Sequence, residues 1–112
     1  MNANEYQKCA LRTVNPDLTP YEQLQNGLMG LCGEAGECID LLKKHMFQGH
    51  AELDREHLAK ELGDVAWYLA VSAEFIGYSL EEIFEMNIEK LWKRYPEGFD
   101  SIRSGHRAEG DI

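Results

Sequence analysis

The sequence predicts an all-α protein that folds as one four-helix bundle-like domain over residues 1–112. Three observations indicate this fold: apolar residues recur at helical spacing, helix-start signals precede the long segments, and the links between segments are short. Short links favour antiparallel neighbours, which is the arrangement found in bundles. With 112 residues, of which 44% are hydrophobic, the chain suffices for one modest core.

The first two helices are expected over residues 3–13 and about 20–47. Residues 15–17 (Asn-Pro-Asp) separate them, since proline and asparagine interrupt a helical pattern. Residues 19–22 (Thr-Pro-Tyr-Glu) are a strong helix start, because threonine caps, proline suits the first helical position and glutamate completes a capping box. Gly49 is the expected stop of the second helix.

Two further helices are expected over about 55–76 and 80–95. Asp54 is a suitable cap for the third helix, and residues 79–82 (Ser-Leu-Glu-Glu) form a second capping box that opens the fourth. The remaining segment, 97–112, is polar and contains glycine, so we expect a mobile tail unless a ligand or a neighbouring subunit orders it.

Two acidic pairs stand within the second and third helices: Glu34-Ala35-Gly36-Glu37 and Glu61-Leu62-Gly63-Asp64. Residues three apart share one helix face, and an antiparallel hairpin brings the two faces together. Four carboxylates beside a packed core repel one another unless a cation lies among them. Oxygen ligands predict Mg²⁺, with Mn²⁺ as the alternative, and such clusters usually serve chemistry on phosphate esters.

The fourth helix carries an amide and two cationic side chains, in contrast to the carboxylates of the second and third helices. Asn87 falls within its apolar stripe, and Lys90 and Arg94 fall along the edge of that stripe. Half-buried polar groups need partners, and this set suits direct contacts to a polyphosphate. Trp67 adjoins the second acidic pair, and Tyr95 adjoins the basic residues of the fourth helix. Both are candidates to stack on a nucleotide base. The alternative is a core or interface position, which aromatic residues at helical spacing usually hold.

Glycine recurs at every third position of the second helix, at Gly27, Gly30, Gly33 and Gly36. Each interior glycine costs about 1 kcal/mol relative to alanine, so we expect another helix or a ligand to come close to this backbone. A tolerated glycine run near a frayed helix start is the alternative.

Composition excludes several classes of function. The net charge of −9 argues against binding of DNA or RNA polymers, which requires basic faces, but not against a nucleotide carried with Mg²⁺. No apolar run of about 18 residues and no leader pattern is present, so we expect no membrane partner and a cytoplasmic location.

The cysteines and histidines lack metal-ligand or disulfide patterns. We therefore expect reduced thiols at Cys9, Cys32 and Cys38 and surface positions for His45, His50, His57 and His106.

Four sequence blocks, taken in order, resemble the MazG-like nucleotide pyrophosphohydrolases of the all-α NTP pyrophosphatase superfamily. They are residues 30–37 (Gly-Leu-Cys-Gly-Glu-Ala-Gly-Glu), 60–68 (Lys-Glu-Leu-Gly-Asp-Val-Ala-Trp-Tyr), 87–91 (Asn-Ile-Glu-Lys-Leu) and 94–99 (Arg-Tyr-Pro-Glu-Gly-Phe). The resemblance covers roughly residues 20–100. Either acidic pair alone is a weak signal, whereas the ordered combination of the four blocks is much more specific.

The resemblance implies an enzyme that hydrolyses nucleoside triphosphates to monophosphate and pyrophosphate in nucleotide house-cleaning, as a homodimer or homotetramer. It implies four catalytic, metal-ligating residues: Glu34, Glu37, Glu61 and Asp64. It also implies that Asn87 and Lys90 hold phosphate oxygens, with Arg94 as a weaker candidate. Many relatives carry another acidic residue where this chain has Gly33, which leaves the number of metal ions open. The alternatives are a catalytically inactive nucleotide- or protein-binding module of the same fold, and a structural bundle with a solvated acidic face.

Overall fold

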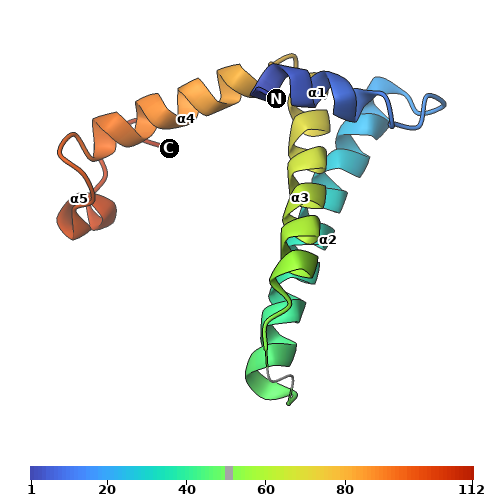
Figure 1. Ribbon diagram of the computed structural model, residues 1–112. Helices are drawn as coiled ribbons and strands as arrows, with labels where there is room; N and C mark the ends of the chain where they lie inside the picture. Colours follow the sequence, from blue (N-terminus) through green and yellow to red (C-terminus); the bar gives the residue numbers. More distant parts are fainter. Residues whose placement is uncertain (50–51) are drawn as a thin grey trace. The chain divides into compact units, whose positions relative to one another are not determined.

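The structure, a computed structural model, describes residues 1–49 and 52–112 and is helical throughout, with no strand in that part of the chain (Figure 1). His50 lies outside the described residues. The helices are α1 (Ala3–Leu11), α2 (Pro20–Phe47), α3 (Arg55–Phe75), α4 (Leu80–Arg94) and α5 (Ser101–Gly105). The all-α prediction is confirmed, with one correction: the described residues hold five helices, because a short helix that the sequence analysis missed lies in the tail.

Local signals at the helix starts account for the bounds of α2 and α3. The capping box is present, since the Glu22 amide donates to Thr19 Oγ1 at 3.2 Å and the Thr19 amide donates to Glu22 Oε1 at 3.0 Å. Asp54 caps α3 by accepting from the His57 amide at 3.0 Å. These bonds satisfy amide groups that a helix start otherwise leaves without partners.

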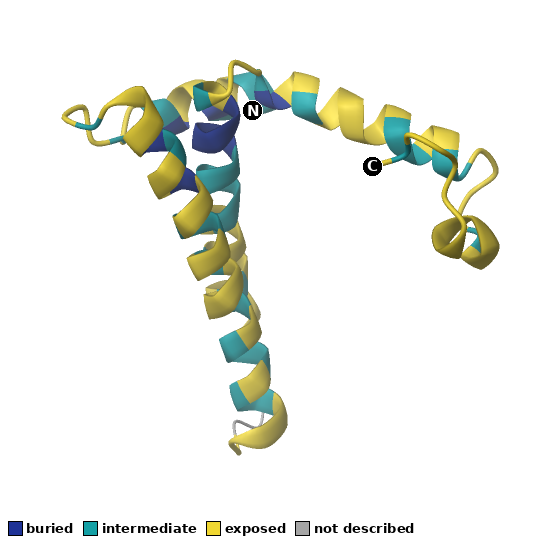
Figure 2. Cartoon of the chain, turned by 180° about the vertical axis from the view of Figure 1, so that it is seen from behind, coloured by how far each residue is buried: buried dark blue, intermediate teal, exposed yellow. Residues whose placement is uncertain are grey.

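Residues Met1–Leu80 form one compact unit in which α2 and α3 lie side by side as an antiparallel hairpin and α1 packs against α3 (Figure 1). The buried apolar core of the described residues is small and consists of Ala10, Ala70, Val71, Ala73 and Leu80. Trp67 and Leu69 pack against the cluster that Ala10, Ala70 and Leu80 form. Figure 2 shows the buried residues gathered at the α1 end of the hairpin, while the rest of the hairpin is half-buried or exposed. The two acidic pairs lie in that less buried part.

A buried glutamine joins three segments of this unit. Gln7 is 4% exposed, and its Nε2 donates to the carbonyl oxygens of Ala70 and Tyr78, at 3.2 Å each. Its Oε1 accepts from the Leu80 amide at 2.8 Å. Because buried polar atoms require partners, Gln7 fixes α1 to the turn at the end of α3.

Residues Glu81–Ile112 form a second compact unit, which contains most of α4, the short α5 and the end of the chain. The expected mobile tail instead folds against α4, because Arg94 forms a two-point ion pair with Asp111, with both N–O distances 2.8 Å. Asp100 also caps α5, accepting from the Ile102 amide at 2.8 Å. Within the described residues, no helix combines the length and apolarity that crossing a membrane requires.

Candidate metal centre and anion pocket

Three carboxylates from the two helices of the hairpin converge on one place. Glu34 projects from α2, and Glu61 and Asp64 project from α3; one oxygen of each lies within 4.8 Å of the others. Glu34 and Glu61 are half-buried and Asp64 is exposed. This convergence follows from the sequence, since residues three apart on α3 share one face and the hairpin turns that face toward α2.

The electrostatics of this cluster call for a positive charge. A hydrogen bond between the carboxyl groups of Glu34 and Glu61 raises the pKa of Glu34 above its ordinary value, and partial burial and the charges of Glu61, Asp64 and Glu37 raise it further. Nearby carboxylates disfavour the charged form of a carboxyl group, and its pKa rises as a result. A divalent cation supplies that positive charge, so this donor set fits a hard, oxygen-ligated ion.

Glu37, the fourth predicted ligand, is exposed and lies outside the set whose oxygens fall within 4.8 Å of one another. Its charge nevertheless contributes to the raised pKa values of Glu34 and of the Cys38 thiol, so it lies near the cluster. The described side chains therefore form a set of three carboxylates with a fourth beside it, rather than four equivalent ligands.

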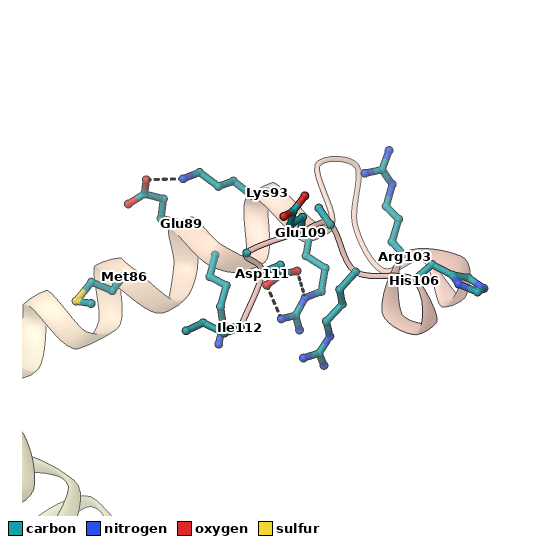
Figure 3. A pocket seen from close by; sticks show the side chains of 13 residues that line it. Met86, Glu89, Lys93, Arg103, His106, Glu109, Asp111 and Ile112 are labelled. Atoms are coloured by element: carbon teal, nitrogen blue, oxygen red, sulfur yellow. Dashed lines mark hydrogen bonds and ion pairs between the residues drawn. The ribbon is translucent and has the colours of Figure 1, made fainter.

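The predicted phosphate contacts lie in the second unit, and two of them line a pocket of about 600 Å³. Lys90 and Arg94 come from α4, while the rest of the lining includes Arg103, His106 and Arg107 (Figure 3). Asn87 is exposed on the same helix and is not among the lining residues. The pocket therefore gathers several cations from α4 and the tail.

Comparison with known proteins identifies the family of this chain. The family model of the MazG nucleotide pyrophosphohydrolase domain matches residues 22–99. This chain belongs to the MazG nucleotide pyrophosphohydrolase family. It is also 35% identical over 85 residues to the Gene 37 protein of Mycobacterium phage L5, a match that covers 73% of this chain and 75% of the phage protein. No solved structure matches the chain.

Three side chains lie beside the carboxylates of this MazG domain, although the sequence analysis did not place them there. His57 Nε2 lies 3.1 Å from Glu61 Oε1. Burial and the neighbouring carboxylates, Glu61 first among them, raise the pKa of the Cys38 thiol. Tyr6 donates to the Gly63 carbonyl at 3.4 Å. The four-residue spacing of His57 and Glu61 on one helix was a readable signal, whereas the Tyr6 contact depends on tertiary packing.

The aromatic candidates of the MazG domain have structural contacts. The Trp67 indole nitrogen donates to Thr13 Oγ1 at 2.8 Å and to the Ala10 carbonyl at 3.2 Å, which ties α3 to the end of α1. In the second unit, the rings of Tyr95 and Phe99 have centroids 5.6 Å apart. Binding of a base by Trp67 or Tyr95 stays a prediction.

Half of the glycine run is explained by packing between α2 and α3. A Cβ atom at Gly27 would meet the hydroxyl of Ser72, and one at Gly30 would meet the ring of Tyr68. At Gly33 and Gly36, no heavy atom of the described residues, apart from the chain neighbours and the helix backbone itself, lies within 4 Å of that position. The expected close approach is therefore confirmed at the first two glycines, while the last two border the acidic pair and face open space.

Proposed function

We propose that this MazG domain hydrolyses a nucleoside triphosphate to the monophosphate and pyrophosphate in the presence of Mg²⁺. The observation that carries the proposal is the convergence of Glu34, Glu61 and Asp64 within 4.8 Å, where the neighbouring carboxyl groups raise the pKa of Glu34. Carboxylates held this close on two helices repel one another, which destabilises the fold. A bound cation would offset this repulsion.

Glu34, Glu61 and Asp64 would hold Mg²⁺, or Mn²⁺ as the alternative, and Glu37 would join them or act on water. When bound, the ion offsets negative charge on phosphate oxygens and lowers the pKa of a bound water. The histidine beside Glu61 orients this carboxylate through the 3.1 Å contact. The oxygen-only donor set favours Mg²⁺ and Mn²⁺ over zinc, which prefers nitrogen and sulfur ligands.

In the proposed reaction, a water oxygen attacks the α-phosphorus in line with the bond to the departing pyrophosphate. The new bond joins the water oxygen to the α-phosphorus, the bond from this phosphorus to the bridging oxygen breaks, and a carboxylate accepts the proton of the water. Glu37 and Glu61 are the two candidates for this base. Asn87, Lys90 and Arg94 of α4 are proposed to bind phosphate oxygens, where positive charge favours departure of pyrophosphate.

We further propose that the protein acts as a homodimer or homotetramer. Several large apolar side chains of the hairpin are strongly exposed in the single chain: Leu28, Met29, Ile39, Met46, Phe47 and Leu62. Exposed apolar area of this extent usually marks a surface that another protein covers. Light scattering at micromolar concentration tests the proposal, and a monomer would contradict it.

The activity is tested by incubating the purified protein with a panel of ribo- and deoxynucleoside triphosphates and Mg²⁺, and measuring pyrophosphate release. Glu61→Gln is expected to lower kcat by about a hundredfold or more, since this carboxylate is both a ligand and a candidate base. Glu56→Gln is the matched control on α3, because Glu56 forms only an exposed pair with Lys60 at 3.7 Å.

Three outcomes separate the alternatives. Pyrophosphate release that Glu61→Gln abolishes and Glu56→Gln retains supports the proposal. Thermal stabilisation by Mg²⁺ and nucleotide without turnover favours the inactive binding module. Release of orthophosphate in place of pyrophosphate contradicts the proposed site of attack.

A further inference from the structure

The pocket that Lys90, Arg94 and Arg107 line, here called the anion pocket, holds a carboxylate of the chain itself, that of Asp111. Arg94 Nε and one terminal nitrogen donate to the two carboxylate oxygens of Asp111, both at 2.8 Å. The two side chains are only 9% and 13% exposed. This two-point geometry is the one by which arginine recognises a phosphate as well as a carboxylate.

More positive charge surrounds this carboxylate than it can neutralise. The hydrogen bond from Arg94 lowers the pKa of Asp111 despite its partial burial, and the charges of Arg94, Arg107 and Lys90 lower it further. All four residues line the same pocket, whose interior of about 600 Å³ exceeds what one carboxylate fills (Figure 3). Over the whole lining, five lysine and arginine side chains face three carboxylate side chains, those of Glu89, Glu109 and Asp111, so the site is net positive in a chain whose overall charge is −9.

A turn places the carboxylate in this position. The Asp111 amide donates to the Ala108 carbonyl at 3.1 Å, which closes a turn over residues 108–111. Gly110 has a φ of +83° at the third position of this turn, where side-chain-bearing residues are disfavoured. The position of Asp111 thus depends on the backbone conformation of Gly110.

We propose that Lys90, Arg94 and Arg107 form a binding site for the terminal phosphates of a polyphosphate, and that Asp111 is a built-in competitor which the phosphates displace. The inference rests on the proposed function for the identity of the anion. It adds Arg107 to the binding residues and assigns the tail a role as a replaceable occupant of the site. An Asp111 carboxylate that holds the Arg94 guanidinium for about nine-tenths of the time weakens apparent phosphate affinity about tenfold.

The test measures binding of inorganic pyrophosphate by titration calorimetry, in buffer freed of divalent cations. Asp111→Asn keeps the shape of the side chain and removes its charge, and it is expected to lower the dissociation constant for pyrophosphate about tenfold. Glu109→Gln is the control, because it removes the same charge from the same turn while both Arg94 nitrogens bond to Asp111. Its dissociation constant should change less than about twofold, since an exposed charge is largely screened.

Gly110→Ala supplies a second, independent variant. It leaves every charge in place but strains the turn, so it is expected to release Asp111 and to tighten pyrophosphate binding in the same direction as Asp111→Asn. In an Arg94→Gln background, Asp111→Asn should lose most of its effect, because the partner for which carboxylate and phosphate compete is gone.

The inference is overturned if Asp111→Asn binds pyrophosphate no more tightly than the parent, if Glu109→Gln tightens binding equally, or if neither parent nor variant binds pyrophosphate. These outcomes are separate from those of the activity assay, because calorimetry without Mg²⁺ requires neither the carboxylate cluster nor turnover. A protein that binds pyrophosphate as expected but hydrolyses no triphosphate disproves the proposed function and leaves the competitor in place.

Discussion

Gly30→Ala is the most direct test of how closely α2 and α3 approach beside the acidic cluster. A Cβ atom at position 30 would fall on the ring of Tyr68, while one at position 33 on the same helix would meet open space. The two substitutions share the same gain in helix propensity, about 1 kcal/mol each. The difference between them therefore isolates the steric cost at Gly30.

The expected magnitude follows from these two terms. Overpacking typically costs about 1–3 kcal/mol, so Gly30→Ala should lower the free energy of unfolding by about 0–2 kcal/mol after the propensity gain. Gly33→Ala should raise it by about 1 kcal/mol. For a chain of 112 residues, 1 kcal/mol corresponds to a Tm shift of about 4 °C, so the two variants should differ in Tm by roughly 4–12 °C.

Thermal and urea unfolding, followed by circular dichroism, measure this difference. Gly27→Ala should fall between the two, because the Ser72 hydroxyl that it meets can rotate away more easily than a tyrosine ring. Equal Tm values for Gly30→Ala and Gly33→Ala would refute the packing derived from the hairpin. A concentration-dependent loss of stability in Gly33→Ala would instead show that a second copy covers that face.

Three further predictions concern packing and charge. Gln7→Leu should lower the free energy of unfolding by about 2 kcal/mol in urea titrations, because it leaves the buried Leu80 amide without its acceptor. Trp67→Phe should cost about 1 kcal/mol through the lost bonds to α1; unchanged stability with a raised KM would instead indicate contact with the base. The raised pKa of Glu34 gives the metal-free protein a stabilising contribution that is fully present below the ordinary value of 4.5 and is lost as pH rises through the raised pKa. The Tm of the metal-free protein should therefore fall over that window relative to Glu34→Gln, and a parallel pH profile of Tm for the two proteins would exclude the raised pKa.

Local rules were sufficient for the elements that carry the acidic pairs. The capping box at residues 19–22 and the cap at Asp54 act within four residues of chain, so the sequence predicted the starts of α2 and α3 correctly. Helical periodicity and a short link then indicated that carboxylates of the two helices meet. Three of them do meet within 4.8 Å, and only side-chain geometry distinguishes Glu37 from the other three.

Long-range contacts could not be predicted in the same way. Gln7 and Ala70 are 63 residues apart, and Trp67 and Thr13 are 54 apart, so no periodic pattern links the members of either pair. In the tail, polarity suggested mobility, yet Asp111 is held because its partner Arg94 lies on a helix 17 residues earlier. Polar composition predicts weak apolar packing, but it carries no information on ion pairs between particular residues.

The two units of this MazG domain carry charged groups of opposite sign. In the first unit, the hydrogen bond between Glu34 and Glu61, with partial burial and the neighbouring carboxylates, raises the pKa of Glu34. In the second unit, Arg94 binds the carboxylate of Asp111 in a pocket that Lys90 and Arg107 also line. Under the proposed function, a cation bound by the first group would lower the pKa of Glu34 and release a proton. Under the further inference, a polyphosphate bound by the second group would displace Asp111. These two expected effects are independent, because each concerns the residues of one unit.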